Sequence, residues 1–392
     1  MSREFNVTLS ERLGKLPPYL FAELDRLKSK AISEGKDVID LGIGDPDTPT
    51  PEHIIEALRK TAGNPENHRY PSYIGMKIFR EACSKWVKKR FGVSFNPDNE
   101  VISLIGSKEA VANIPFAFVN PGDTVLIPSP GYPVYTSGTI FCGGTQHIMP
   151  LKAENKFLPD FKIISENVLK NTKLMFLNYP NNPTSVTAEI DFYREAVELA
   201  YKYNIIICHD AAYSETAFGG YKAPSIFNVD GARDVAIELH SFSKTYNMTG
   251  WRVGFAIGNE KIVGGLAKIK TNVDSGVFQA IQYAAIEAME NGEKDIEMMA
   301  EIYSGRRKVM EDGLKRAGFS VTPSRATFYM WIPCPKGYDS KKLSSKILEE
   351  AAIVTTPGVG FGEYGEGYIR FALTSDKKRL EEACDRLARL KL

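Results

Sequence analysis

Residues 235–254 have the sequence VAIELHSFSKTYNMTGWRVG, and this stretch carries much of the information about the fold. The apolar run from Val235 to Leu239 is typical of a buried strand, and small hydroxyl residues then lead to Lys244. In open α/β sheets, ligands bind at the carboxyl ends of the strands, so this lysine lies where a ligand is expected. Desolvation there would lower the pKa of its amine and make the amine available for a Schiff base.

Groups that bind anions surround this lysine in the sequence. Ser241 and Ser243 precede it, and Arg252 follows eight residues after it. The stretch GSKEA at 106–110 follows a predicted strand and opens a predicted helix with Ser107 as its N-cap. The free N–H groups and the dipole of such a helix start bind phosphate. Together these features predict a phosphorylated ligand beside the lysine.

From about residue 100 to 260, short apolar runs alternate with stretches of helical periodicity such as Phe192 to Tyr203. The runs interpreted as buried strands are Val101 to Ile105, Thr124 to Ile127, Leu174 to Leu177, Ile205 to Cys208, Val235 to Leu239 and Val253 to Ile257. This alternation predicts an α/β fold with a mainly parallel sheet.

The C-terminal part has a different pattern. It contains a long helical stretch at 276–317, apolar runs typical of strands at 327–332, 353–356 and 368–373, and a charged helix at 376–390. We therefore predict a large domain at 46–290 and a small discontinuous α+β domain formed by 1–45 and 291–392.

The composition excludes several classes of protein. The 392 residues include 49 Lys and Arg against 48 Asp and Glu, which leaves no excess of positive charge for nucleic acid or an acidic membrane. The five cysteines are odd in number and widely spaced, which favours reduced thiols, and adjacent strand residues such as Cys208 and His209 point to opposite faces, so no metal site is predicted. No signal peptide or membrane span is visible, and we predict a cytoplasmic protein.

Two further polar stretches follow predicted strands. Asp210 lies two residues after the run Ile205 to Cys208, and the turn Asn178 to Thr184 follows the preceding strand. An aspartate at a strand end is often only a helix N-cap, and Asn and Pro are ordinary turn residues. Both stretches could also reach the crevice that contains Lys244, and the residues alone leave the two interpretations open.

In this order the motifs resemble those of the fold-type I aminotransferases of the aspartate aminotransferase superfamily, which depend on pyridoxal 5′-phosphate. The resemblance covers nearly the whole chain. The matching segments are Leu41 to Pro46, Tyr70 with Gly75, Ser107-Lys108, Pro130 to Tyr132, Asn182-Pro183, Asp210 to Tyr213, Ser243-Lys244, Gly250 to Arg252, and Arg370.

The resemblance implies a role for each matching residue. Lys244 would bind the cofactor covalently and move the proton at the substrate Cα, and Asp210 would pair with the pyridine nitrogen. Asn182 and Tyr213 would donate hydrogen bonds to the phenolic oxygen, and Tyr132, counted with the catalytic residues, would stack on the ring. The phosphate would be held by Ser107, Lys108, Ser241, Ser243, Arg252 and, from a second subunit, Tyr70.

On the substrate side, Arg370 would clamp the α-carboxylate in a bidentate pair, and Gly44 would leave room for its close approach. The substrate-binding residues that the resemblance implies are Tyr19, Gly44, Lys108, Tyr132, Asn182 and Arg370. Because Tyr70 would come from a neighbouring subunit, the resemblance implies a homodimer with shared active sites.

Within the superfamily, the sequence resembles in particular the LL-diaminopimelate aminotransferases. The segments that carry this similarity are Pro18 to Ala22, Ile105 to Lys108, His209 to Ser214, His240 to Lys244 and Thr356 to Gly362. The implied activity is amino-group transfer between LL-diaminopimelate or tetrahydrodipicolinate and glutamate or 2-oxoglutarate, a step of lysine biosynthesis. Tyr19 and Lys108 would help hold the far end of the long substrate.

Alternatives remain open at this level. The loop Tyr70 to Gly75 contains no acid to meet a distal ammonium group, although Asp274 could serve one, so a broad alanine- or aspartate-type aminotransferase is the first alternative. A β-lyase or decarboxylase that uses the same cofactor is the second. A non-catalytic DNA-binding regulator is disfavoured because no helix-turn-helix segment precedes residue 45 and the net charge is +1.

Overall fold

A seven-stranded sheet forms the centre of the computed structural model, which describes residues 5–17 and 20–391. The strand order is β2-β8-β7-β6-β5-β3-β4; β3 to β7 are mutually parallel, and β8 is antiparallel to both of its neighbours. The bounds are β2 Val101–Leu104, β3 Thr124–Ser129, β4 Thr145–Pro150, β5 Thr172–Leu177, β6 Ile206–Asp210, β7 Ala236–Ser241 and β8 Gly254–Gly258. The predicted α/β class with a mainly parallel sheet is confirmed.

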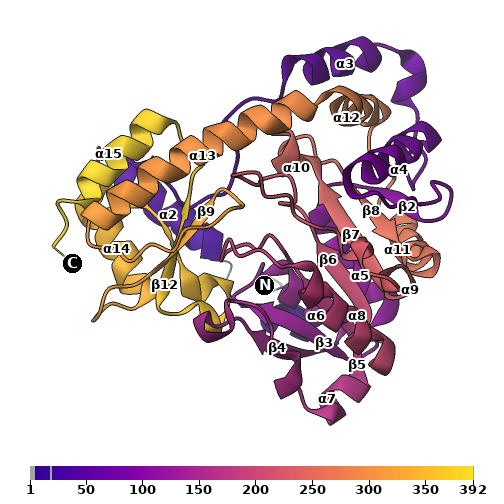
Figure 1. Cartoon of the computed structure of the whole chain (residues 1–392), viewed down its shortest axis with the longest axis horizontal. Helices are drawn as coiled ribbons and strands as arrows, with labels where there is room; N and C mark the ends of the chain where they lie inside the picture. Colours follow the sequence, from indigo (N-terminus) through magenta and orange to yellow (C-terminus); the bar gives the residue numbers. More distant parts are fainter. Residues whose placement is uncertain (1–4, 18–19, 392) are drawn as a thin grey trace.

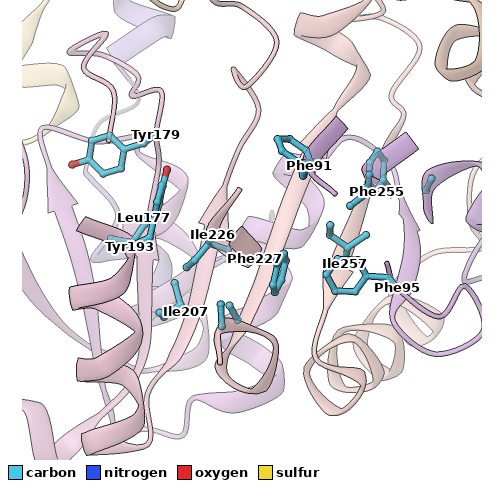
Figure 2. Packing of buried hydrophobic residues seen from close by; sticks show 14 of the residues in the cluster. Phe91, Phe95, Leu177, Tyr179, Tyr193, Ile207, Ile226, Phe227, Phe255 and Ile257 are labelled. Carbon is cyan, nitrogen blue, oxygen red and sulfur yellow. The ribbon is translucent and has the colours of Figure 1, made fainter. Parts of the chain in front are cut away.

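Helices cover both faces of this sheet, which explains why its strands are continuous apolar runs. One face packs against α5 (Ser107–Phe118), α6 (Val134–Cys142) and α11 (Glu260–Val273). The other face packs against α3 (Glu52–Ala62), α4 (Lys77–Phe91), α8 (Ile190–Tyr203) and α12 (Gln279–Asn291), and Figure 2 shows part of this core, including Ile207, Phe255 and Phe91. Alternate residues of each strand therefore enter different cores.

A second, smaller lobe is built around a separate core (Figure 1). Its sheet has the order β11-β12-β9, and a two-stranded parallel sheet joins β1 to β10. The strand bounds are β1 Ile39–Asp40, β9 Tyr329–Pro333, β10 Ile353–Val354, β11 Thr356–Pro357 and β12 Tyr368–Ala372. Its helices are α2 (Leu20–Ser33), α14 (Ser340–Ala351), α15 (Lys377–Leu387) and the long α13 (Glu293–Arg316), which runs between the two lobes (Figure 1).

The remaining short helices are α1 (Glu11–Gly14), α7 (Glu166–Asn171), α9 (Ala232–Val235) and α10 (Phe242–Thr245). Within the described residues, no helix combines the length and the apolar character that crossing a lipid bilayer requires. The division into a large domain at 46–290 and a small one at 1–45 and 291–392 stays a prediction; the second core lies mainly in the latter segments but also includes Ala212, Tyr213 and Phe218.

The structure differs from the predicted elements at three places. The edge strand β4 was not expected, because its residues are mostly half-exposed and its sequence TQHIMP is not a continuous apolar run. The run 353–356 is divided between β10 and β11, which pair with different strands. The helical stretch 276–317 is two helices that meet at Gly292, where a side chain would collide with the ring of Tyr246.

A buried polar cluster lies on one face of the sheet between β6 and β7. The carboxylate of Glu238 accepts hydrogen bonds from His209 Nδ1 and His240 Nε2, both at 2.9 Å, from Ser225 Oγ at 2.9 and 3.0 Å, and from the backbone N–H of Ile226 at 3.0 Å. Glu238 is 0 % exposed, so this cluster holds the two strands together through charge-assisted bonds.

The side chains of Cys208 and His209 were predicted to point to opposite faces of the sheet. Cys208 enters the core formed with α5 and α6, whereas His209 faces the other core and lies 3.2 Å from the hydroxyl of Tyr193. Their predicted opposite orientation is confirmed. Within the described residues, no group of three or more His, Cys, Asp or Glu side chains is placed to hold a metal ion.

Replacing Glu238 by glutamine should lower the free energy of unfolding at pH 7 by about 3 kcal/mol, because the substitution breaks a buried charged network. Burial alone would raise the pKa of Glu238, but hydrogen bonds from His209 and His240 outweigh burial and hold it well below its usual range. Its stabilising contribution is therefore present above the unfolded-state pKa of about 4.3 and is lost as the pH falls toward the folded-state pKa.

Urea unfolding of the wild type and the Glu238→Gln variant at several pH values tests this. The difference between them should narrow by about 1–2 kcal/mol from pH 5 to pH 3. Glu195→Gln, at an exposed position of α8, is the matched control and should change stability by less than about 0.5 kcal/mol. A Glu238→Gln effect that stays constant over this pH range would contradict the assignment.

Candidate active site

The carboxyl ends of β5, β6 and β7 bring the predicted site residues to one edge of the sheet. The three strands are parallel and adjacent, with Leu177 beside His209 and Asp210 beside Leu239. The turn that follows β5 contains Asn182, β6 ends at Asp210, and β7 ends at Ser241. Residues that are far apart in the sequence therefore meet at this edge because parallel strands end on the same side.

Lys244 lies on the single turn of α10, directly after β7. The side chain of Ser241 caps this turn by accepting a hydrogen bond from the N–H of Ser243 at 3.3 Å. The ammonium group of Lys244 donates to the carbonyl oxygen of Gly44 at 2.7 Å and has no carboxylate partner among the described side chains. Burial lowers the pKa of Lys244 to about 8. A neutral amine is therefore accessible close to physiological pH.

Asp210 is a buried carboxylate whose two oxygens differ in their hydrogen bonding. Its Oδ2 accepts a hydrogen bond from the hydroxyl of Tyr135 at 3.0 Å, and its Oδ1 has no hydrogen-bond partner among the described residues. Burial raises its pKa, while the bond from Tyr135 and the nearby His209 lower it. The N-cap interpretation of Asp210 therefore does not account for Oδ1, which is arranged to accept a hydrogen bond from a ligand.

Arg370, on β12, is a buried cation with 2 % of its surface exposed. Its guanidinium donates to Asn182 Oδ1 at 2.8 Å and to the carbonyl oxygen of Gly42 at 2.7 Å. No carboxylate among the described side chains pairs with it, and its Nε has no hydrogen-bond partner there. A buried charge without a counter-ion is costly, so this geometry favours an anionic ligand.

The residues predicted to hold a phosphate lie around the start of α5. This helix begins at Ser107 with Gly106 as its N-cap, so the prediction of Ser107 as the N-cap was wrong by one residue. Gly106 has a φ of +73°, and a Cβ there would collide with the guanidinium of Arg252. Arg252 therefore lies directly against the helix start.

The other predicted phosphate residues differ in their exposure. Ser241 and Ser243 are buried, Ser107 is half-buried, and the Lys108 side chain is exposed. Gly254 brings the edge of β8 close to this cup, since a Cβ there would lie 3.2 Å from the N–H of Ser107. The backbone N–H groups at the start of α5 and the guanidinium of Arg252 therefore form an anion-binding cup, and Ser241, which pairs with Gly254, lies on the strand next to it.

The predicted tyrosines occupy different environments. Tyr213 is buried, and its hydroxyl lies 3.0 Å from that of Tyr329. Tyr132 is half-buried, and its ring packs edge-on against Tyr135 with the ring centres 5.8 Å apart. Tyr70 is 83 % exposed. Tyr19 lies outside the described residues.

Sequence reasoning missed several residues that complete this arrangement. They are Tyr135, which holds Asp210; Tyr329 and Phe361, whose rings lie against Arg370; and Gly42 and Thr356, whose oxygens lie near its Nη2. Tyr135 is three residues after Tyr132, a spacing that places two side chains on one face of a helix and could have indicated it. The others come from the smaller lobe or the N-terminal segment. Gly42, Thr356 and Phe361 belong to segments that carry the resemblance, but no contact with Arg370 was predicted for them.

The family model described as "Aminotransferase class I and II" matches residues 36–387. The chain belongs to the class I and II aminotransferases.

The LL-diaminopimelate aminotransferase of Aquifex aeolicus is 55% identical over 383 residues, which cover 98% of this chain and 99% of the relative. The enzyme of the same name from Syntrophobacter fumaroxidans is 53% identical over 381 residues, covering 97% and 98%. Among solved structures, substrate-bound BacF from Bacillus subtilis is 38% identical with a TM-score of 0.95 and covers 99% of both chains. An aspartate aminotransferase double mutant from Thermus thermophilus is 26% identical with a TM-score of 0.91 and covers 98% of this chain and 100% of its own.

These comparisons confirm the aspartate aminotransferase-like fold and the predicted family. The protein is therefore an aminotransferase that depends on pyridoxal 5′-phosphate. The residues present fit this cofactor: Oδ1 of Asp210 is a buried acceptor without a partner, the start of α5 offers N–H groups with Arg252 beside it, and Lys244 has a pKa lowered toward neutrality.

The lowered pKa of this aminotransferase's Lys244 predicts a distinct reactivity profile. The amine is protonated below about pH 8 and neutral above it, so acylation of Lys244 in the cofactor-free protein should reach half its maximal rate near pH 8. Exposed lysines, with pKa values of about 10.4, should reach theirs about two units higher. Brief labelling with acetic anhydride at pH 6 to 11, followed by peptide mass spectrometry, measures both classes in one sample. A Lys244 profile that coincides with that of the surface lysines would contradict this assignment.

Proposed function

We propose that this aminotransferase transfers an amino group between LL-diaminopimelate and 2-oxoglutarate, forming tetrahydrodipicolinate and glutamate, as a step of lysine biosynthesis. Relatives named LL-diaminopimelate aminotransferase, 53% and 55% identical over nearly the whole chain, support this substrate. The observation that carries the reaction type is the buried guanidinium of Arg370, which has no carboxylate partner among the described side chains and lies in the same site as the amine of Lys244. Every α-amino acid and 2-oxoacid supplies the carboxylate that this cation lacks.

When bound, pyridoxal 5′-phosphate supplies an aldehyde that takes up the amino group and a ring that accepts the electron pair left at the substrate Cα. We assign the removal and return of the Cα proton to the amine of Lys244, because its lowered pKa suits a base near neutrality. We assign Oδ1 of Asp210 to accept a hydrogen bond from the ring N–H. The bond from Tyr135 to Oδ2 keeps this carboxylate oriented and favours its charged form.

The amide of Asn182 has a defined orientation in this assignment. Its Oδ1 accepts a bond from Arg370, so its Nδ2 is the group that can donate to the phenolic oxygen of the cofactor, together with the hydroxyl of Tyr213. Nε of Arg370, with no partner among the described residues, is available to donate to the substrate carboxylate alongside Nη2. We assign Tyr132 to the face of the ring.

Gly44 was expected to leave room for the substrate carboxylate, but the ring of Tyr329 lies beside it. A Cβ at this position would collide with the hydroxyl of Tyr329, so the glycine is required by that ring as well as by any approaching substrate. We assign the phosphate to Ser107, Lys108 through its backbone, Ser241, Ser243 and Arg252, and we retain Tyr19 as a substrate-binding residue.

We also propose a homodimer in which Tyr70 reaches the phosphate of the neighbouring subunit. Tyr70 is 83 % exposed, and the nearby Tyr73, Val273 and Phe278 are exposed as well. The two loops that carry these residues are in contact, because Gly276 lies against Ser72 and Tyr73. Exposed apolar residues on adjoining loops support an interface between copies of the chain. We also propose that the enzyme works in the cytoplasm, because its five cysteines are all free in the structure, as is usual in a reducing compartment.

A second candidate, a broad alanine- or aspartate-type aminotransferase, is favoured by one observation. Asp274, which could have met the distal ammonium group of diaminopimelate, already bonds the ammonium of Lys270 at 2.9 and 3.0 Å. Lys270 is 0 % exposed and also bonds Glu109 at 2.9 and 3.1 Å. The carboxylate is thus largely neutralised before any substrate arrives.

Half-reactions of the cofactor-loaded enzyme distinguish the two candidates. Mixing with single amino acids while recording the visible absorbance should show that LL-diaminopimelate and glutamate convert the cofactor at least about tenfold faster than alanine, aspartate or phenylalanine, the discrimination that about 1.4 kcal/mol provides. The Lys244→Ala variant, as control, should show neither the visible band nor turnover. If diaminopimelate is inert while alanine and aspartate react, the broad-specificity candidate replaces the first.

Arg370→Lys tests the carboxylate clamp. Lysine keeps the charge but cannot form the bidentate pair, so KM for both the amino acid and the oxoacid should rise about 100-fold, the effect of losing one hydrogen bond to a charged group. Arg379→Lys is the matched control, since Arg379 pairs with Asp37 at the surface, and it should leave KM unchanged. Steady-state kinetics over both substrates give these values. Equal effects of the two variants would argue against the clamp.

A further inference from the structure

Tyr329, the first residue of β9, lies where the two lobes meet and has no role in the assignments above except its proximity to Gly44. It is 2 % exposed. Its backbone carbonyl accepts hydrogen bonds from Ser185 at 2.8 Å and from Arg307 at 3.2 Å. The side chain is thus carried on a backbone held from both sides, and its ring and its hydroxyl each contact a different residue of the site.

The ring of Tyr329 supports the guanidinium of Arg370. The centre of the guanidinium lies 4.1 Å from the ring centre of Tyr329 and 4.6 Å from that of Phe361. Burial lowers the pKa of Arg370, and no carboxylate among the described side chains offsets this. The faces of two aromatic rings therefore provide electrostatic stabilisation that a counter-ion would otherwise give.

The hydroxyl of Tyr329 contacts the opposite side of the site. It lies 3.0 Å from the hydroxyl of Tyr213, and either oxygen can be the donor. If Tyr213 donates its proton to the phenolic oxygen of the cofactor, its own oxygen is left to accept from Tyr329. Hydrogen bonds in such a chain strengthen one another, so this contact would make Tyr213 a better donor.

The position of the ring is fixed by its contact with Gly44. A Cβ on Gly44 would overlap both the hydroxyl and the adjacent ring carbons of Tyr329, so only glycine permits this packing. The carbonyl of the same residue accepts the hydrogen bond from Lys244 at 2.7 Å. Tyr329 therefore contacts Tyr213 and Arg370 directly, and it is connected to Lys244 through Gly44.

We propose that Tyr329 is a positioning residue with two separable effects: its hydroxyl strengthens the hydrogen bond that Tyr213 gives to the cofactor, and its ring holds Arg370 ready for the substrate carboxylate. This inference rests on the roles assigned to Tyr213 and Arg370 under the proposed function. It predicts that removal of the hydroxyl and removal of the ring have different consequences.

Three variants separate these consequences. Tyr329→Phe removes only the hydroxyl, and Tyr329→Leu removes the hydroxyl and the ring. Tyr303→Phe is the matched control, because Tyr303 belongs to the same core and its buried hydroxyl has no hydrogen-bond partner among the described residues. For each cofactor-loaded variant, the visible absorbance is titrated with pH in the absence of substrate, and KM and kcat are measured with glutamate and 2-oxoglutarate.

For Tyr329→Phe, the midpoint of the absorbance titration should rise by about 0.3 to 0.5 pH unit, because a weakened donor stabilises the ionised phenolic oxygen less. Its KM should stay within about twofold of the wild type, because the ring is retained. Tyr329→Leu should show the same shift together with KM values raised about tenfold, the effect of one buried cation–π contact. Tyr303→Phe should change neither quantity.

An unchanged midpoint in Tyr329→Phe would overturn the effect of the hydroxyl, and an unchanged KM in Tyr329→Leu would overturn that of the ring. A shift in Tyr303→Phe equal to that in Tyr329→Phe would also overturn the inference, because it would reflect a general response of the core. Tyr329→Phe keeps the test valid if Tyr329→Leu does not fold. Failure of the proposed function is distinguishable, because the wild type would then leave LL-diaminopimelate unconverted while the pH titration of Tyr329→Phe still reports on Tyr329.

Discussion

The site depends on one electrostatic condition: a guanidinium is buried between two lobes without a carboxylate to balance it among the described side chains. Arg370 is accommodated only because Gly42, Asn182 and two aromatic rings take the place of a counter-ion. These groups come from the N-terminal segment, the central sheet and the smaller lobe. These contacts offset part of the cost of burying the charge, and they also bring the three parts of the chain together. A substrate carboxylate would supply the missing counter-ion.

The buried anion of the site, Asp210, is stabilised in a different way from Arg370. Asp210 is also buried; the hydroxyl of Tyr135 donates to one of its oxygens, and the other has no hydrogen-bond partner among the described residues. A carboxylate in this state is an acceptor that a protonated ring nitrogen can satisfy, and burial raises its pKa unless such a partner arrives. The site thus presents an incomplete cation and an incomplete anion, and an amino acid joined to the cofactor would complete both. This complementarity explains why neither group is neutralised by its own chain.

Sequence reasoning reached the residues that follow strands and missed those that meet across lobes. Lys244 and Asp210 could be predicted because an apolar run marks the strand and parallel strands end at one edge. The start of α5 was displaced by one residue, because a glycine with positive φ caps it without using a side chain. The contacts of Tyr329 and Thr356 with Arg370 could not be predicted, because these residues are far apart in the sequence and only the packing of the smaller lobe brings them together. The edge strand β4 was missed because half-exposed strands lack a continuous apolar run.

A third arrangement of charges lies beside the start of α5, around Asp274, the residue considered above for the distal ammonium group of diaminopimelate. Lys270 is fully buried and bonded to both Glu109 and Asp274, so this group of three carries one excess negative charge when all are ionised. Glu109 also accepts a bond from the backbone N–H of Ile105, which ties the group to the start of α5 and hence to the anion-binding cup. Loop 70–75 contacts Gly276, two residues after Asp274. A single residual charge can attract a distal ammonium group without burying it against a dedicated carboxylate, which avoids the cost of a pair that smaller substrates would leave broken. Under the proposed function, discrimination between long and short amino acids would depend on this residual field rather than on one contact.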